Sequence, residues 1–182
     1  MTNILIRNWS IYLLNGIVAL LYGIFALFIP AETLVIMAWY AGLVILLGGI
    51  LVLLVVANRI RKELPYGWQL AQAILYMAIG ALVMIYTNES IHFFVAAMGV
   101  LAIIAGILQL IVLINIDPSF GGKNLMLVNA LITLAFGVLM LVNPFTVAQA
   151  FVILSGLMAM VFGSLLIWFS FRLRELQKHQ IS

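Results

Sequence analysis

Long apolar runs alternate along the chain with short polar separators, and the pattern occurs six times. The runs cover roughly residues 9–29, 34–57, 68–87, 91–114, 124–143 and 147–171. Each run is close to the length of about 20 apolar residues that a helix needs to cross the hydrocarbon of a membrane. The pattern therefore predicts an all-α integral membrane protein with six transmembrane helices, in a single transmembrane domain over residues 1–182.

Composition agrees with a chain that faces lipid. Of the 182 residues, 67% are hydrophobic and 7% are charged, and the mean hydropathy is +1.32. A soluble domain is normally about a quarter charged, because its surface meets water. Six spans leave room for short connections only. Cysteine is absent, which excludes disulfides, thiolate catalysis and Cys-ligated metals.

The charges divide the separators into two kinds. Three tight turns, at residues 30–33, 87–90 and 143–146, hold no Lys or Arg. The eight basic residues lie in the other separators and near the two ends of the chain: Arg7, Arg59, Arg61, Lys62, Lys123, Arg172, Arg174 and Lys178. By the positive-inside rule, this asymmetry predicts that both termini are cytoplasmic. Such scattered positions do not form a phosphate-binding face, so nucleic acid is not expected as a partner.

Three glycine columns recur with a period of 57 residues. They are Gly23, Gly80 and Gly137, then Gly42, Gly99 and Gly156, and finally Gly49, Gly106 and Gly163. Chance placement of the glycines would give ~0.03 such columns at one period. The period divides the chain into three tandem helical-hairpin repeats, at 9–65, 66–122 and 123–179. Each repeat holds two spans, so the repeats run parallel, and three parallel copies are consistent with a pseudo-threefold bundle.

The glycines have the spacing of helix-packing residues. Gly42 and Gly49 are seven residues apart, which places them on one helix face two turns apart, and the other repeats keep this spacing. Small residues let helix backbones approach closely in lipid. We interpret the columns as packing positions. A glycine-lined conduit or a flexible gate is the alternative.

Amides form one further aligned column, made of Asn15, Gln72 and Asn129. Each lies a short way inside a span, where polar groups normally face other helices or water. One interpretation is interhelical hydrogen bonding, which is common in membranes. The other is a ring of amides around a central axis, which would make a polar constriction or a headgroup site.

Glu32, Glu89 and His92 lie near the predicted outer face. Carboxylates and histidine change charge between roughly pH 4 and 7, so these residues are candidates for sensing external acidification. They also fit as solvated turn and cap residues, because carboxylates favour the positive end of a helix. The third repeat has Thr146 in the aligned position.

Tryptophans flank the predicted cytoplasmic ends of the spans, among them Trp9 and Trp168, as an interfacial aromatic belt would. The basic tail from Arg172 onward can continue the last helix and contact anionic lipid. A solvated helix end is the alternative.

The apolar runs hold no Asp, Glu, Lys or Arg, and His92 lies at the margin of its run. Ion-coupled transporters normally keep an ionisable group in this region. The sequence also lacks a nucleophile–base pair, a metal-ligand spacing and a nucleotide fingerprint. We therefore predict that the protein is not an enzyme, and that it has no catalytic residues, no metal site and no cofactor.

A resemblance to a known family rests on short motifs that recur in the three repeats. In the first repeat these are Asn15-Gly16, Tyr22-Gly23, Pro30, Gly42 and Gly49-Ile50. Over nearly the whole chain the pattern resembles the HdeD family of bacterial acid-resistance membrane proteins. The resemblance implies a six-span protein of the bacterial inner membrane, linked in the family's namesake to survival in acid. The family has no established catalytic or ligand residues, so none is carried over.

Three functions follow as hypotheses. The first is a non-enzymatic inner-membrane protein of HdeD type that serves in acid or envelope stress. The second is a small channel or transporter that uses the amide column, for an ion or small molecule whose identity stays open. The third is a scaffold that forms homo-oligomers or binds lipid. All three have the lipid bilayer as a partner.

Overall fold

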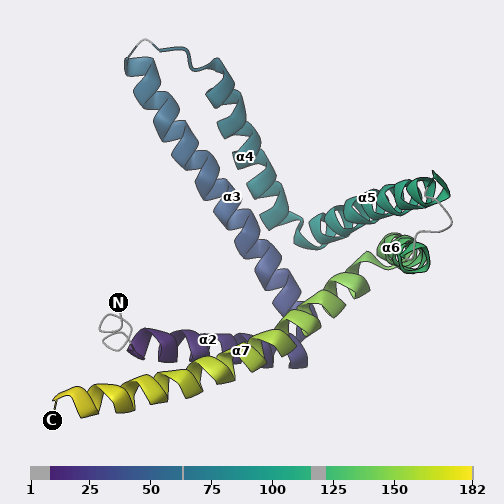
Figure 1. Ribbon diagram of the computed structural model, residues 1–182. Coiled ribbons are helices and arrows are strands. Elements are labelled where there is room, and N and C mark those ends of the chain that lie inside the picture. Colours follow the sequence, from purple (N-terminus) through teal and green to yellow (C-terminus); the bar gives the residue numbers. More distant parts are fainter. Residues whose placement is uncertain (1–8, 63, 116–121, 182) are drawn as a thin grey trace. The chain divides into compact units, whose positions relative to one another are not determined.

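The computed structural model describes residues 9–62, 64–115 and 122–181, with side chains in the last helix described as far as Arg174. Arg7 and the side chain of Lys178, two of the eight basic residues, lie outside this part. Six helices follow one another in it (Figure 1): α2 (Trp9–Phe28), α3 (Pro30–Arg61), α4 (Gly67–Ile85), α5 (Thr87–Asn115), α6 (Lys123–Val142) and α7 (Pro144–Ile181).

All six helices are long and apolar enough to cross a membrane, so the prediction of six such helices is confirmed. At most 17% of the residues in the apolar stretch of each helix are buried inside the protein. Large apolar side chains such as Phe28, Phe93 and Leu125 are exposed. Exposed apolar surface of this extent is what lipid-facing helices present.

The tight turns are shorter than the sequence predicted. One residue separates the helices at each of them, namely Ile29, Tyr86 and Asn143. Pro30 and Pro144, expected in turns, instead begin α3 and α7. Proline fits the first helical position, because its missing N–H would have no partner inside the helix and its φ is already helical.

Threonine hydroxyls donate to backbone carbonyl oxygens at two of these turns. Thr33 Oγ1 donates to the carbonyl oxygen of Ile29 at 2.9 Å, and Thr87 Oγ1 donates to that of Val83 at 2.9 Å. Helix ends leave carbonyl oxygens without an intrahelical partner, and the Thr87 hydroxyl satisfies one such group. The carbonyl oxygen of Ile29 also accepts the backbone N–H of Thr33 at 3.0 Å. A chain that turns within one residue therefore keeps its backbone groups satisfied, which an apolar environment requires.

Contacts divide the chain into two compact units. One unit is Met1–Leu34 with Gln149–Ser182, and its helices are α2 and the greater part of α7. The other is Val35–Ala148, which holds most of α3, all of α4, α5 and α6, and the start of α7. Within this second unit, α4 and α5 diverge from the connection between them (Figure 1).

Helices pack through the glycine columns, in three pairs. We call each contact a glycine seam: α3/α4, where Gly42 lies against Gly80 and Gly49 against Met77; α5/α6, where Gly99 lies against Gly137 and Gly106 against Leu134; and α2/α7, where Gly156 lies against Gly23 and Gly163 against Leu20. The second residue of each contact is again 57 positions from its counterparts. The three seams are therefore copies of one contact, in which glycine backbones lie close to a second helix.

Burial follows the same spacing. On each of α3, α5 and α7, three buried residues lie seven apart: Gly42, Gly49 and Val56; Gly99, Gly106 and Leu113; Gly156, Gly163 and Ser170. Seven residues are two helical turns, so these positions form a stripe along one face. A stripe with this spacing is typical of helices that cross at a small angle.

Each seam joins the second helix of one repeat to the first helix of another repeat. The α3/α4 and α5/α6 seams join successive repeats. The α2/α7 seam joins the last repeat to the first, inside one compact unit. The hairpin repeat is thus a unit of the sequence. The close glycine contacts, by contrast, form between helices of different repeats.

Candidate functional site

The amides of the predicted column lie at the edges of the glycine seams. Asn15 directly precedes the buried Gly16, and Gln72 and Asn129 precede the buried Ala73 and Ala130. A helical residue next to a buried one points about 100° away from it, so each amide borders the seam without entering it. The side chains of Asn15 and Asn129 are accordingly exposed on the protein surface, and that of Gln72 is half-buried.

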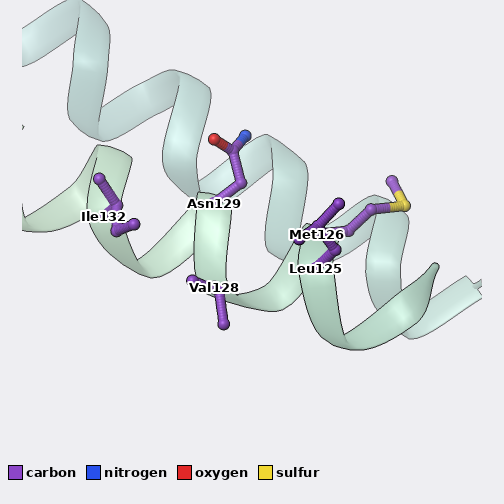
Figure 2. Close-up of a pocket in the computed structure, with 5 residues that line it drawn as sticks. All are labelled: Leu125, Met126, Val128, Asn129 and Ile132. Atoms are coloured by element: carbon purple, nitrogen blue, oxygen red, sulfur yellow. The ribbon is translucent and has the colours of Figure 1, made fainter.

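Asn129 forms a hydrogen bond across the α5/α6 seam. Its Nδ2 donates to Oε1 of Gln109 at 3.1 Å. Figure 2 shows the Asn129 side chain directed toward the neighbouring helix, away from Val128. At this position the amide therefore bonds to a neighbouring helix.

The other two amides have different surroundings. Gln72 Nε2 donates to the hydroxyl oxygen of Tyr76 at 3.0 Å, one turn along its own helix. Asn15 belongs to the other compact unit. An arrangement of all three amides around one axis stays a prediction.

Gln109 is a residue that the repeat analysis missed. Its counterparts one period away are Val52 and Leu166, so no polar column marks the position. It is, however, the one polar side chain with an amide inside the apolar run 91–114. A lone amide in such a run usually faces another helix, and that signal could have identified it.

A shallow hollow of about 380 Å³ lies beside Asn129 (Figure 2). Its other lining residues are apolar: Leu125, Met126, Val128 and Ile132. Ligand sites typically combine such apolar walls with a few polar groups. The hollow could hold a hydrocarbon chain next to one amide, and its lining supplies no charged group.

Glu89 and His92 lie together at the start of α5. With Asn88 they line a hollow of about 290 Å³. The His92 ring stacks on the ring of Phe145, with the centroids 5.6 Å apart and an angle of 27° between the planes. Both side chains are exposed.

Glu32 lies in the first turn of α3, as Glu89 does in α5. Carboxylates at this position interact favourably with the positive end of the helix. The cap interpretation fits both residues. Glu32 belongs to the other compact unit, and a joint role for Glu32, Glu89 and His92 in sensing pH stays a prediction.

Polar side chains also bridge α2 and α7. The hydroxyl oxygens of Tyr22 and Ser155 lie 2.7 Å apart. Ser170, which is fully buried, donates its hydroxyl to the carbonyl oxygen of Trp9 at 2.8 Å. This seam therefore holds hydrogen bonds at two levels in addition to its glycine contacts.

Two arginines contact tryptophan rings at the same end of the α2/α7 pair as Ser170. The guanidinium carbon of Arg172 lies 5.6 Å from the ring centre of Trp168, and that of Arg174 lies 5.0 Å from the ring centre of Trp9. Both distances are within the range of cation–π attraction. The sequence indicated an aromatic belt and a basic tail separately, whereas the structure brings them into contact.

Among the residues that the structure describes, no three His, Asp or Glu side chains lie close enough together to share a metal ion.

Comparison with known families gives three matches along the chain. The model of a family described as a short repeat of unknown function (DUF308) matches residues 14–85, 71–142 and 128–181. The matches begin 57 residues apart, in agreement with the period of the glycine columns. The first two each extend from one repeat into the next, and so include the α3/α4 and α5/α6 seams. No match was found among curated proteins or among solved structures. Because the three matches together cover most of its length, the chain belongs to the DUF308 short-repeat family.

Proposed function

We propose that this protein is a non-enzymatic, multi-pass protein of the bacterial inner membrane, of HdeD type, that serves in acid or envelope stress resistance. The observation that carries the proposal is the set of three family repeats joined by glycine seams. The membrane location is supported by six apolar helices, and the stress role by the resemblance to HdeD. The mechanism of protection is open.

The hydrogen bonds support a structural role for the polar side chains inside the helices. Thr33, Thr87 and Ser170 donate to backbone carbonyl oxygens, and Asn129 donates to Gln109. The bonds of Ser170 and Asn129 join two helices, and donors that are bound to the protein in this way are not available to a substrate. We infer that these side chains serve packing and not turnover.

The orientation that we propose follows from charge. All eight Lys and Arg residues lie near the termini and in the two longer connections, so both termini are cytoplasmic. The starts of α3, α5 and α7 then lie on the outer side, with Glu32, Glu89 and His92 exposed to the acid.

Survival of a bacterial strain tests the stress role. The host's own copy of the gene is removed, and the strain is exposed to an acid pH that kills most of its cells. We expect the wild-type chain and the Gly48→Leu variant to restore survival, because a side chain at Gly48 would meet open space. Gly80→Leu should not restore it, because the backbone of α3 lies against Gly80. Survival of the deletion strain equal to wild type, in acid and in envelope stress, would contradict the proposal.

A channel or small transporter is the second candidate. The observation that favours it is the position of Asn129, which lines an open hollow and also bonds to Gln109. Proton or ion flux into liposomes, under a pH gradient, would be compared for wild type and for the triple variant Asn15→Leu, Gln72→Leu, Asn129→Leu. Loss of flux in the triple variant supports the candidate, and an unchanged flux counts against it.

A further inference from the structure

The geometry points to a binding site for anionic phospholipid at the end of the α2/α7 pair, formed by Trp9, Trp168, Arg172 and Arg174. The inference rests on the membrane location proposed above, and it names a partner and a place that this location alone does not give. It is independent of any role in stress.

The site combines residues of the first and the last helix of the described chain. Trp9 is the first residue of α2, and the other three side chains come from α7. Ser170, fully buried between the helices, holds the carbonyl oxygen of Trp9 at 2.8 Å. This bond fixes the start of α2 against α7 and so fixes the Trp9 ring that Arg174 contacts.

Tryptophan contacts orient the arginines without using all their donors. A guanidinium has five N–H groups, and attraction to a ring face leaves N–H groups free for other acceptors. Arg172 and Arg174 are exposed beyond their rings. Phosphate oxygens are the acceptors that guanidinium groups match best, because two parallel N–H groups can reach two oxygens.

Position and charge select a lipid as the source of that phosphate. Tryptophan favours the boundary between hydrocarbon and headgroups, so the rings place both guanidiniums at headgroup level. Basic side chains next to a span attract anionic lipids. The first turn of α2 contains no acidic residue, and the side chain of Glu175, next to Arg174, lies outside the described part.

A second basic cluster provides the matched control. Arg59 and Arg61 end α3, and Arg59 Nη1 lies 3.5 Å from the carbonyl oxygen of Pro65, which it contacts in place of a ring. Replacing both removes the same charge as replacing Arg172 and Arg174. If only general attraction mattered, the two double variants would behave alike.

The test uses full-length protein purified in mild detergent, with palmitoyl-oleoyl phosphatidylglycerol as the probe and phosphatidylcholine of the same chains as the reference. Native mass spectrometry measures retained lipid, and a thermal melt measures stabilisation. We expect wild type and Arg59→Gln/Arg61→Gln to retain phosphatidylglycerol in preference to phosphatidylcholine. We expect Arg172→Gln/Arg174→Gln to retain about tenfold less of it. The thermal shift produced by phosphatidylglycerol should fall in parallel.

Variants at the rings separate a positioned site from a pair of charges. Trp9→Leu and Trp168→Leu keep both arginines, and each should reduce the preference for phosphatidylglycerol. Arg172→Lys/Arg174→Lys keeps the charge but loses the planar fork, and should retain less lipid than wild type. Melting temperatures in phosphatidylcholine show which variants are folded, and an unfolded variant is replaced by the lysine pair for the comparison.

Several results would overturn the inference. They are equal loss in the two glutamine double variants, full retention by the lysine pair, absence of preference in the wild-type protein, and displacement of the lipid by inorganic phosphate at millimolar concentration. Any of these in correctly inserted protein removes the lipid site and leaves the proposed function intact. Failure of the chain to insert into lipid nanodiscs would remove both.

Discussion

Gly99 on α5 and Gly137 on α6 lie face to face, and the backbone of each occupies the space that a side chain on the other would need. A Cβ atom at Gly99 would lie 2.9 Å from the carbonyl oxygen of Gly137, and one at Gly137 would lie 3.0 Å from that of Gly99. Such distances are too short for a carbon and an oxygen that are not bonded. With a side chain at either position, the two backbones would have to move apart. In an apolar environment this closeness matters, because dispersion between helices replaces the hydrophobic effect as the main attraction.

Neighbouring glycines on α3 should respond in opposite ways to one methyl group. A Cβ at Gly49 would lie 2.8 Å from the backbone nitrogen of Met77, whereas a Cβ at Gly48 would meet nothing within 4 Å. We expect Gly49→Ala to lower the free energy of unfolding by about 1–3 kcal/mol. Gly48→Ala should leave it unchanged or raise it by up to about 1 kcal/mol, since alanine favours the helix. Unfolding in mixed micelles measures both, and equal effects would contradict the seam.

The aligned glycines of α2, α4 and α6 should behave alike in all three seams. A Cβ at Gly23 would lie 2.8 Å from the carbonyl oxygen of Gly156, and one at Gly80 would lie 2.8 Å from that of Gly42. We expect Gly23→Ala, Gly80→Ala and Gly137→Ala each to destabilise the protein by about 1–3 kcal/mol. If Gly23→Ala alone had no effect, the α2/α7 seam would not be equivalent to the other two.

The bond between Asn129 and Gln109 should give a small coupling energy. Hydrogen bonds between membrane helices average about 0.6 kcal/mol, because the separated helices also find partners. A double-mutant cycle with Asn129→Leu and Gln109→Leu measures the coupling. Gln72 and Tyr76, which bond within one helix, provide the comparison, and their cycle should affect the association of helices less. Coupling of zero between Asn129 and Gln109 would exclude the bond.

Cysteine labelling tests the orientation of the chain in the membrane. Because the natural sequence has no cysteine, only the introduced cysteine can react. Single cysteines are placed at Glu32, at Glu89 and at Arg61. In intact cells, we expect a membrane-impermeant maleimide to label the first two, and to label the third only after permeabilisation. Labelling of Arg61→Cys in intact cells would reverse the predicted topology.

The sequence predicted the six helices well, since hydropathy over about 20 residues is a strong signal. It placed the starts of α3, α5 and α7 too late. Pro30 and Thr87 look like turn residues in a sequence, yet proline and hydroxyl residues also suit the first turn of a helix. Local pattern alone does not separate these two uses.

The sequence could not show which helices pair. Every repeat carries the same glycine columns, so pairing inside a repeat and pairing between repeats use the same residues. The choice depends on the direction in which the chain leaves each one-residue connection, as at Tyr86 between α4 and α5. Hydropathy and spacing contain no information about that direction.

The candidate sites were predicted in part, for a similar reason. The amide column was visible because it recurs with the period, whereas Gln109 and the Arg174–Trp9 contact occur once. A contact between the first helix and the last leaves no trace in local spacing. Such features emerge only when distant segments are placed together.

The first and last helices, α2 and α7, form the third seam. Tyr22→Cys and Ser155→Cys replace two side chains whose oxygens lie 2.7 Å apart, and a short bis-maleimide can join them. A protease site in the connection between α3 and α4 then separates the fragment with α2 from the fragment with α7. We predict that crosslinked protein, at a dilution that keeps chains apart, still runs at full length after cleavage. Two separate fragments under the same conditions, in a protein that binds the reagent at both cysteines, would contradict the claim.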